Sequence, residues 1–315
     1  MKVSVIVPIY NTKDYIGQCL DSILAQTLEE IEILAVDDGS TDGTTDILKE
    51  YAQKHPKKIK AFYKENGGLA SARNLALLNA TGEYLGFVDS DDWVSATMYE
   101  EMYNLAKSEE ADIVICDMVD HYKDHDVYHN ASTFTDKFKV TPSACNKIFK
   151  REFIGDIKFP VGLWYEDFEF TTKNLMLTEK ISVIHKDFYH CHCRDVSIMR
   201  NNNSKKNMDI ITVMDNLVSF TKEKGLTDRY SRTLEYLYID HILITTINRL
   251  EAQDGKEKKA VIKEMRGAVK IRYPKIYSGE VFRQMPKSRQ IIAFLNFVGL
   301  SSISKIILNV KAKHR

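Results

Sequence analysis

The sequence predicts an α/β fold with a mostly parallel central sheet, followed by a helical C-terminal region. Two observations predict this fold class. Short apolar, β-branched runs alternate with segments of helical periodicity over residues 1–118, and from about residue 207 only helical periodicity remains. Strands that are joined by helical crossovers must run parallel, with helices on the faces of the sheet.

The first 118 residues contain five expected strands with a helical segment between each pair. The strands are expected at residues 3–9, 33–36, 59–63, 84–88 and 113–116, and the helices at 12–24, 42–54, 69–80 and 95–108. The first run, Val3–Ile9, is apolar at nearly every position, which is typical of a strand buried on both faces. The carboxyl ends of these strands should therefore gather at one edge, where such sheets bind ligands.

The second half of the chain is less regular at first and then helical. Residues 119–142 are polar and are expected to form an irregular insertion, and residues 143–153 are expected to be helical. A helix through residue 178 follows, then strands at 181–184 and 189–193. Helices are expected at 207–224, 229–252 and 256–272, before an apolar tail with basic flanks at 288–310. We predict a first domain over 1–204, with halves at 1–118 and 119–204, and a helical region over 205–315.

The charge of the chain is balanced overall but unevenly distributed. The 315 residues contain 44 Lys+Arg and 44 Asp+Glu, and 28% charged with 44% hydrophobic residues excludes a disordered protein. Residues 281–315 contain seven basic and no acidic side chains. A basic tail on an acidic body favours an anionic surface as a partner and not a nucleic-acid-binding core.

The cysteines and the N-terminus indicate a reducing compartment. Five cysteines without any C-x-x-C spacing do not form a disulfide framework. Cys191 and Cys193 alternate with His190 and His192, so the two cysteines should share one face of a strand. Zinc is not predicted there, because the sequence nearby lacks a second ligand pair. The first apolar run is too short for a signal peptide, and we expect a cytoplasmic protein.

An acidic pair after the fourth strand is the sharpest local signal. Asp89 and Asp91 are two residues apart at a strand end, so both carboxylates can point the same way and share Mg²⁺ or Mn²⁺. The alternative is a solvated acidic turn, with Asp91 and Asp92 capping the next helix.

Two other segments that follow strands are also candidates for ligand binding. Asp38 can accept hydrogen bonds from a base or a ribose, or it can form an Asx turn with a helix cap. Asn66-Gly67-Gly68 allows close backbone approach, and Arg73 offers a fork for phosphate; the alternative is a flexible turn and a solvent-exposed arginine. The glycine spacing fits neither the P-loop nor the dinucleotide fingerprint, which excludes a triphosphate hydrolase and a dehydrogenase.

Five motifs in order make the first 200 residues resemble the inverting family 2 glycosyltransferases. The motifs are residues 4–11 (SVIVPIYN), 37–44 (DDGSTDGT), 66–68 with 70–74 (NGG, ASARN), 87–92 (FVDSDD) and 165–167 (YED). This resemblance implies a GT-A fold and a nucleotide-diphospho-sugar donor, with UDP favoured. Residues 1–118 would then be the nucleotide-binding half, and 119–204 the half with the acceptor site and the base.

The resemblance also assigns roles to residues. The nucleoside pocket would be formed by Pro8, Tyr10, Asp38, Asn66 and Arg73, with Asp38 facing the uracil. In the DSD motif, Asp89 and Ser90 would contact the donor, and Asp91, with Asp89, would bind Mn²⁺ or Mg²⁺. Asp167 would be the general base.

A segment that binds the diphosphate in many relatives is altered here. Arg194 and Ser197 fit the family pattern, whereas His192 stands where an arginine is more usual. His190 or His192 would ligate the metal or contact a phosphate, or both are histidines on the exposed face of an edge strand.

The position of Asp167 also has a physical rationale independent of the family. Glu166 and Asp167 precede a helix whose N-terminal amides and dipole favour carboxylates, so we expect Asp167 to have a low to normal pKa and to be ionised. The alternative is a pair that only caps the helix.

The function implied by the resemblance is metal-dependent inverting transfer of a sugar to a hydroxyl group. The acceptor would be a cell-surface polysaccharide, a teichoic acid or a lipid-linked saccharide. The rivals are a sugar-phosphate nucleotidyltransferase and an inactive nucleotide-sugar-binding scaffold. Residues 281–315 would contact the anionic inner face of the plasma membrane, dock on the catalytic domain or form a homo-oligomer face.

Overall fold

The structure is a computed structural model that describes residues 1–131, 136–193, 205–253 and 257–312. The chain divides into two compact units, one of residues 1–162 and 166–197 and one of residues 163–165 and 198–315. The predicted boundary at 204 borders residues 194–204, which lie outside the described residues, and it stays a prediction. Arg194 and Ser197 lie in the same stretch.

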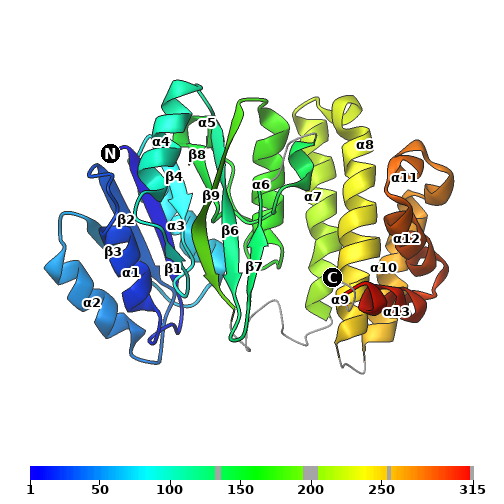
Figure 1. Ribbon diagram of the computed structural model, residues 1–315, viewed down its shortest axis with the longest axis horizontal. Helices are drawn as coiled ribbons and strands as arrows, with labels where there is room; N and C mark the ends of the chain where they lie inside the picture. The colour runs from blue at the N-terminus through cyan, green and yellow to red at the C-terminus, as the bar shows by residue number, and fades with distance from the viewer. Residues whose placement is uncertain (132–135, 194–204, 254–256, 313–315) are drawn as a thin grey trace. The chain divides into compact units, whose positions relative to one another are not determined.

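The first unit is built on a mixed sheet that is nine-stranded within the described residues (Figure 1). Strands β3, β2, β1 and β4 are neighbours and run parallel, as do β6 and β9, while β8 lies antiparallel between β4 and β6. β5 pairs with β9 and β7 with β6, both antiparallel. The strands are β1 (Val3–Ile9), β2 (Ile31–Asp37), β3 (Ile59–Tyr63), β4 (Tyr84–Phe87), β5 (Trp93–Val94), β6 (Ile113–His121), β7 (Asp126–His129), β8 (Lys147–Lys150) and β9 (Ile181–His192).

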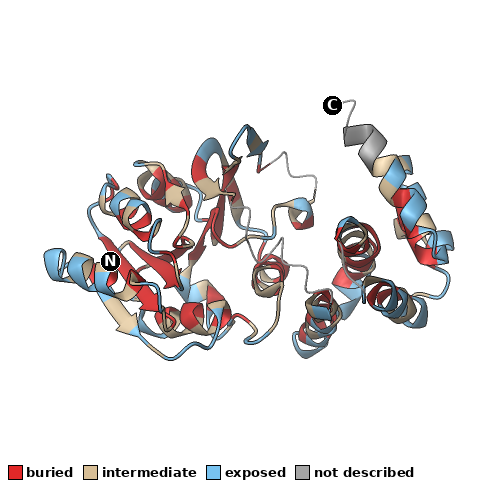
Figure 2. Ribbon diagram, turned by 90° about the horizontal axis from the view of Figure 1, so that it is seen from below, coloured by how far each residue is buried: buried red, intermediate tan, exposed pale blue. Residues whose placement is uncertain are grey.

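Helices cover the sheet and bury its central strands. Every residue of β1 and β2 is buried, and Figure 2 shows the buried positions concentrated in the strands and on the inner faces of the helices. α3 packs on β1 and β2, and α4 packs on β6 and β9. The helices of this unit are α1 (Ile16–Leu24), α2 (Thr44–Lys54), α3 (Leu69–Asn79), α4 (Met98–Ser108), the short 3₁₀ turn η1 (Lys137–Lys139), α5 (Arg151–Ile154) and α6 (Glu166–Leu177). Burial on both faces explains why these strands are continuous apolar runs.

The predicted secondary structure is wrong at several places between residues 119 and 193. Residues 143–153, predicted as a helix, contain strand β8 and the single turn α5. The insertion at 119–142 contains the end of β6 and all of β7, and the two strands predicted at 181–193 form one strand, β9. For β8 and β9, pairing with strands distant in sequence overrides the local pattern, whereas β7 forms a hairpin with β6.

The second unit is helical. Its elements are η3 (Lys205–Met208), α7 (Asp209–Glu223), α8 (Thr227–Leu237), the π-helical η4 (Tyr238–Thr246), α9 (Ile247–Ala252), α10 (Lys258–Arg272), η5 (Ile276–Ser278), α11 (Glu280–Gln284), α12 (Lys287–Val298) and α13 (Ser301–Ala312). Within the described ranges, none of the helices has both the length and the apolar character needed to span a bilayer. The predicted fold class, a mostly parallel α/β sheet followed by a helical region, is confirmed.

The strand order fixes where a ligand can bind. The chain builds β2 and β3 on one side of β1 and then returns to β4 on the other side. The crossovers therefore diverge beyond the carboxyl ends of β1 and β4, and such a point leaves a crevice in open α/β sheets. A hydrogen bond of 3.1 Å between the hydroxyls of Thr12 and Ser90 joins the loops that follow these two strands.

Candidate active site

The loops after β1 and β2 hold each other in place. The Asn11 amide donates to the Ser40 hydroxyl (3.0 Å), and the Thr41 amide donates to the Asn11 side chain (2.8 Å). Asn11 is in the left-handed region with φ 52°, which an asparagine tolerates better than most residues. Pro8 is buried in β1 opposite Val36. Tyr10, in the loop after β1, is 50% exposed.

Asp38 connects the second and third loops. Its buried carboxylate accepts hydrogen bonds from the Gly67 amide (3.0 Å), the Gly68 amide (2.7 Å) and the Lys64 ammonium group (2.5 Å). The prediction that Asp38 contacts a base or a ribose stays a prediction. The neighbouring Asp37 instead makes the local turn, by accepting from the Ser40 amide at 2.9 Å. Asp38 therefore holds the glycine loop, whose Asn66 is exposed, against the end of β2.

The acidic segment after β4 has three carboxylates with different surroundings. Asp89 is partly exposed and Asp91 is half-buried. Asp92 is buried and accepts from the Tyr189 hydroxyl (2.6 Å) and the His192 amide (2.8 Å). Burial, followed by the charges of Asp89 and Asp91, raises the pKa of Asp92 well above its usual value. Asp92 thus ties the loop after β4 to strand β9. The alternative that it caps the next helix is wrong, because α4 begins only at Met98.

Arg73 lies at the centre of the site. The side chain is 0% exposed, so the alternative of a solvent-exposed arginine is wrong. Its guanidinium contacts the carboxylates of Asp89 (2.7 Å), Glu166 (3.5 Å) and Asp167, and it lies 5.1 Å from the centre of the Phe159 ring. Within the described part of the chain, its Nε has no hydrogen-bond partner. One buried cation therefore connects the acidic loop after β4 with the first turn of α6.

Two carboxylates beside Arg73, those of Glu166 and Asp167, have raised pKa values. Burial raises the pKa of Asp167, and the Arg73 charge opposes this effect only in part. Burial and the charge of Asp167 raise the pKa of Glu166 to about 7, again against Arg73. The predicted low to normal pKa of Asp167 is therefore wrong in direction. The helix N-terminus favours the carboxylate, but burial among other acids outweighs it.

The two histidines of β9 both contact Trp93 but otherwise have different neighbours. His190 stacks on Trp93 at 5.3 Å between ring centres, and its two ring nitrogens lie 3.1 Å from His121 and 2.9 Å from the Ser95 hydroxyl. Burial lowers the pKa of His190. His192 packs on Tyr15, at 4.9 Å between ring centres, where the chain enters α1. His192 is therefore the histidine that lies near the loop after β1.

Several residues of the site carried no local signal in the sequence. Phe159 lies under the Arg73 guanidinium because Asn74 binds its backbone twice, at 2.8 and 3.0 Å. The Ala144 amide donates to Asp167 at 3.3 Å, and Cys145 lies 3.8 Å from Arg73. These contacts join segments more than 20 residues apart, so a pattern search along the chain cannot detect them.

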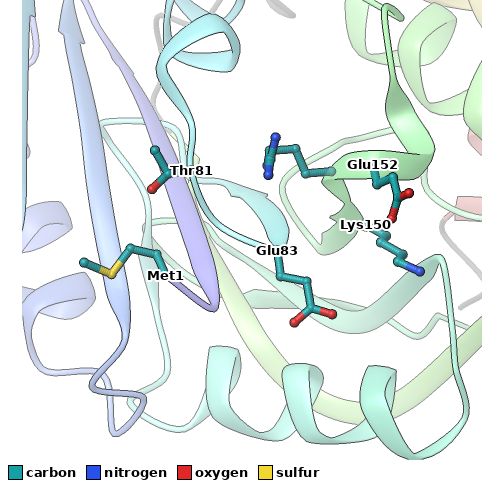
Figure 3. Close-up of a pocket in the computed structure, with 6 residues that line it drawn as sticks. Met1, Thr81, Glu83, Lys150 and Glu152 are labelled. Atoms are coloured by element: carbon teal, nitrogen blue, oxygen red, sulfur yellow. The ribbon is translucent and has the colours of Figure 1, made fainter.

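A hollow of about 350 Å³ lies at the opposite edge of the sheet (Figure 3). Met1, Thr81, Glu83, Lys150, Arg151 and Glu152 line it. These residues stand at the amino ends of β1 and β4, whereas the acidic loops follow the carboxyl ends. The hollow is therefore separate from the candidate site.

An α/β sheet with acidic and glycine-rich loops at its switch point defines a class of proteins that bind nucleotide-linked substrates. Residues 4–188 match the family described as Glycosyl transferase family 2. The chain belongs to this family, as the sequence motifs indicate.

Two relatives agree with this assignment, and one solved structure has a similar fold. Glycosyltransferase GlyG of Streptococcus pneumoniae is 30% identical over 269 residues, covering 74% of this chain and 89% of that protein. Glycosyltransferase GlyA of the same species is 34% identical over 221 residues, covering 63% of this chain, and this chain spans only 32% of GlyA. The structure of S. aureus TarS 1–349 in complex with UDP-GlcNAc superimposes with a TM-score of 0.73 at 22% identity, covering 99% of this chain and 92% of that one.

Proposed function

We propose that this chain transfers a sugar from a nucleotide-diphospho-sugar, with UDP as the nucleotide, to a hydroxyl group, and that it inverts the anomeric configuration. The observation that carries the proposal is the Arg73 guanidinium, which joins Asp89 at the switch point to Asp167 at the start of α6. Family membership supports the reaction class, and the UDP-GlcNAc complex of TarS, which has a similar fold, supports the donor class.

The donor would bind along the carboxyl edge of β1, β2 and β4. Tyr10 is exposed enough to stack on a base, and Pro8 forms the buried floor beside it. Asp38 and Asn66 would line the nucleoside pocket, Asp38 through the loop that it holds. Ser90 would contact the donor next to Asp89, and His192, from its place beside Tyr15, would contact the diphosphate. Arg194 and Ser197 stay candidates for the diphosphate as well.

Asp91 and Asp89 would hold Mn²⁺ or Mg²⁺. The structure fits such an ion, because oxygen ligands suit hard divalent cations and the charges of Asp89 and Asp91 already raise the pKa of the buried Asp92. A bound divalent cation would neutralise the diphosphate as it leaves.

Asp167 would act as the general base. In its ionised form it takes the proton of the acceptor hydroxyl, whose oxygen then forms the new bond to the anomeric carbon as the bond to the diphosphate breaks. Attack from the face opposite the diphosphate inverts the configuration. Arg73 touches Asp167 and Asp89 together, so it would position the base relative to the donor loop.

A binding screen tests the donor assignment. We expect UDP-sugars with Mn²⁺ or Mg²⁺ to raise the melting temperature of the full chain, since a ligand that binds only the native state stabilises it. Asp91→Ala should lose the metal-dependent part of this shift, whereas Asp46→Ala, which changes an 83% exposed carboxylate on α2, should retain it. If no nucleotide sugar stabilises the chain, the donor proposal fails. If donors bind but no sugar is transferred or hydrolysed, the chain is the inactive scaffold.

The acceptor would be a cell-surface glycan, a teichoic acid or a lipid-linked saccharide, reached at the membrane surface through residues 281–315. Along α12, α13 and the turn between them, six large apolar side chains are exposed: Ile291, Phe294, Val298, Leu300, Ile303 and Ile306. Lys287, Arg289 and Lys305 lie among them, and such a combination suits an interface with anionic lipid.

Vesicle sedimentation separates membrane contact from self-association. The full chain should sediment with anionic vesicles more than with neutral ones, and Phe294→Ser with Ile303→Ser should reduce this binding. If the wild type and the double variant sediment equally with anionic vesicles, the proposed membrane contact is wrong. If the substitutions instead convert an oligomer to a monomer in analytical ultracentrifugation, this surface is a homo-oligomer face.

A further inference from the structure

We propose that Cys191, Cys193 and Asp120 form a zinc site between strands β9 and β6, separate from the donor site. One sulfur from each cysteine and a carboxylate oxygen of Asp120 lie within 4.8 Å of one another. All three residues belong to the first unit: Asp120 lies in β6, Cys191 lies in β9, and Cys193 directly follows β9.

The strand register produces this cluster. Asp120 pairs directly with Cys191, so their side chains point to the same face of the sheet. Cys193 is two residues beyond Cys191 and shares that face by alternation. His129 pairs with Met118 on β6, which again is the face of Asp120. The second pair of ligand-type residues, absent from the sequence around the cysteines, is thus supplied by β6 and β7.

The donor atoms suit zinc rather than a hard cation. Thiolate sulfur selects soft or borderline ions, and two cysteines with a carboxylate provide three ligands of the tetrahedral set that zinc adopts. The fourth position would be filled by water.

His129 supports the carboxylate in the way that metal sites require. Its Nε2 lies 2.8 Å from an Asp120 oxygen, and a carboxylate held at one oxygen keeps lone pairs for a metal on the other. Groups that orient a ligand from behind typically change metal affinity by about 10–100-fold. His129 would therefore orient the Asp120 ligand and would not bind the ion itself.

The zinc site is chemically distinct from the proposed Mn²⁺ or Mg²⁺ site, and it has different ligands. His190 and His192 lie on the other face of β9, where His190 contacts His121 and Trp93. The donor-metal ligands Asp89 and Asp91 follow β4 and offer only oxygen. A zinc ion at Cys191 and Cys193 would tie the end of β9 to β6. β9 holds Asp92 through Tyr189 and His192, so the ion would stabilise the floor of the donor site.

Cobalt substitution tests the site without any activity measurement. The full chain is purified with zinc, its metal content is measured, and the metal is then replaced by Co²⁺ after treatment with EDTA. We expect one tightly held zinc ion per chain and a thiolate-to-cobalt charge-transfer band in the near ultraviolet. Cys191→Ser and Cys193→Ser should each lose or strongly weaken this band, and Asp120→Asn should weaken Co²⁺ binding at least tenfold.

Two controls make the result specific. Asp91→Ala should keep the charge-transfer band, because the donor site contains no thiolate, and Cys116→Ala should keep it because Cys116 is buried elsewhere in β6. If the wild-type chain shows no thiolate band, or if the band survives the double substitution of Cys191 and Cys193 by Ser, the zinc site is wrong. If the double variant does not fold, Asp120→Asn alone decides, since loss of affinity supports the site and unchanged affinity overturns it.

Discussion

The two edges of the parallel sheet both bury acidic side chains, yet the acids behave in opposite ways. At the amino edge, Glu32 of β2 accepts four hydrogen bonds, from the hydroxyl groups of Ser4 and Thr81, the Thr81 amide and the Lys60 ammonium group, at 2.6–2.7 Å. Burial alone would raise its pKa, but these donors lower the pKa of Glu32 to about 2. At the carboxyl edge, three carboxylates share one guanidinium, and the pKa values of Glu166 and Asp167 are raised.

The difference lies in the number of donors per carboxylate. Glu32 is saturated by donors from β1, β3 and the loop before β4, so it stays ionised and ties strand ends together. Glu166 and Asp167 compete for Arg73, so a proton is easily accepted there. A structural acid and a base candidate can thus be distinguished by their donors, although burial acts to raise the pKa of both.

The largest expected effect is on catalysis at the carboxyl edge. Asp167→Asn keeps the shape of the side chain but cannot accept a proton, so we expect sugar transfer to fall by about 10²–10⁴-fold while donor binding persists. Steady-state transfer and donor thermal shift measure the two quantities. Transfer near the wild-type rate would show that another group is the base.

Removal of the shared cation should affect stability most. Arg73→Met leaves three carboxylates without their counter-charge, and breaking a buried ion pair costs about 3–5 kcal/mol of unfolding free energy. Denaturant unfolding measures this cost. The matched control at the amino edge is Lys60→Met, whose ammonium is on a side chain 50% exposed and should cost less than about 1 kcal/mol. Equal losses in the two variants would contradict the contrast between the edges.

Glu32→Gln should disturb the amino edge by a smaller amount and in a pH-dependent way. The folded pKa of Glu32 is about 2, below its usual value of 4.5, so its stabilisation is present above pH 4.5 and is lost as the pH falls towards 2. We expect the variant to lose roughly 1–3 kcal/mol at pH 7 and to have a flatter acid limb of stability than the wild type. An unchanged acid limb would mean that Glu32 is not the titrating group.

Glu166→Gln should stabilise the fold, in contrast to Glu32→Gln, and its effect on the unfolding free energy should be the smallest of the four. The folded pKa of Glu166, about 7, lies above its usual 4.5, so the native state holds a proton that the unfolded state loses. Wild-type stability should therefore fall as the pH rises from about 4.5 to 7. Gln mimics the protonated acid and should be more stable than the wild type by about 1 kcal/mol at pH 8. Unfolding curves at pH 5 and pH 8 test this, and a variant less stable at pH 8 would contradict the raised pKa.

The sequence predicted well where the site residues at the carboxyl ends of the strands lie, but it did not predict their contacts. Pro8, Asp38, Asn66 and Asp89 all stand at or just after the strands expected for them, because buried β-branched runs and short crossovers determine where each strand ends. The sequence places Arg73 in the nucleoside pocket or on a phosphate, and this role stays a prediction. Its place beneath three carboxylates depends on α6 and on Phe159, which only the folded chain brings near.

Local sequence patterns predict that the first four strands run parallel, that acidic and glycine-rich loops follow them, and which family the chain resembles. These features follow from local hydrophobic patterns and from motifs within a few residues. Only the tertiary structure decided that β8 is a strand rather than a helix, that the Asp167 carboxyl is harder to ionise than a helix N-terminus suggests, and that Asp120 meets Cys191 and Cys193. Each of these outcomes depends on burial and on pairing between distant segments, which set the local dielectric and the neighbours of a side chain, and neither is encoded in the pattern of adjacent residues.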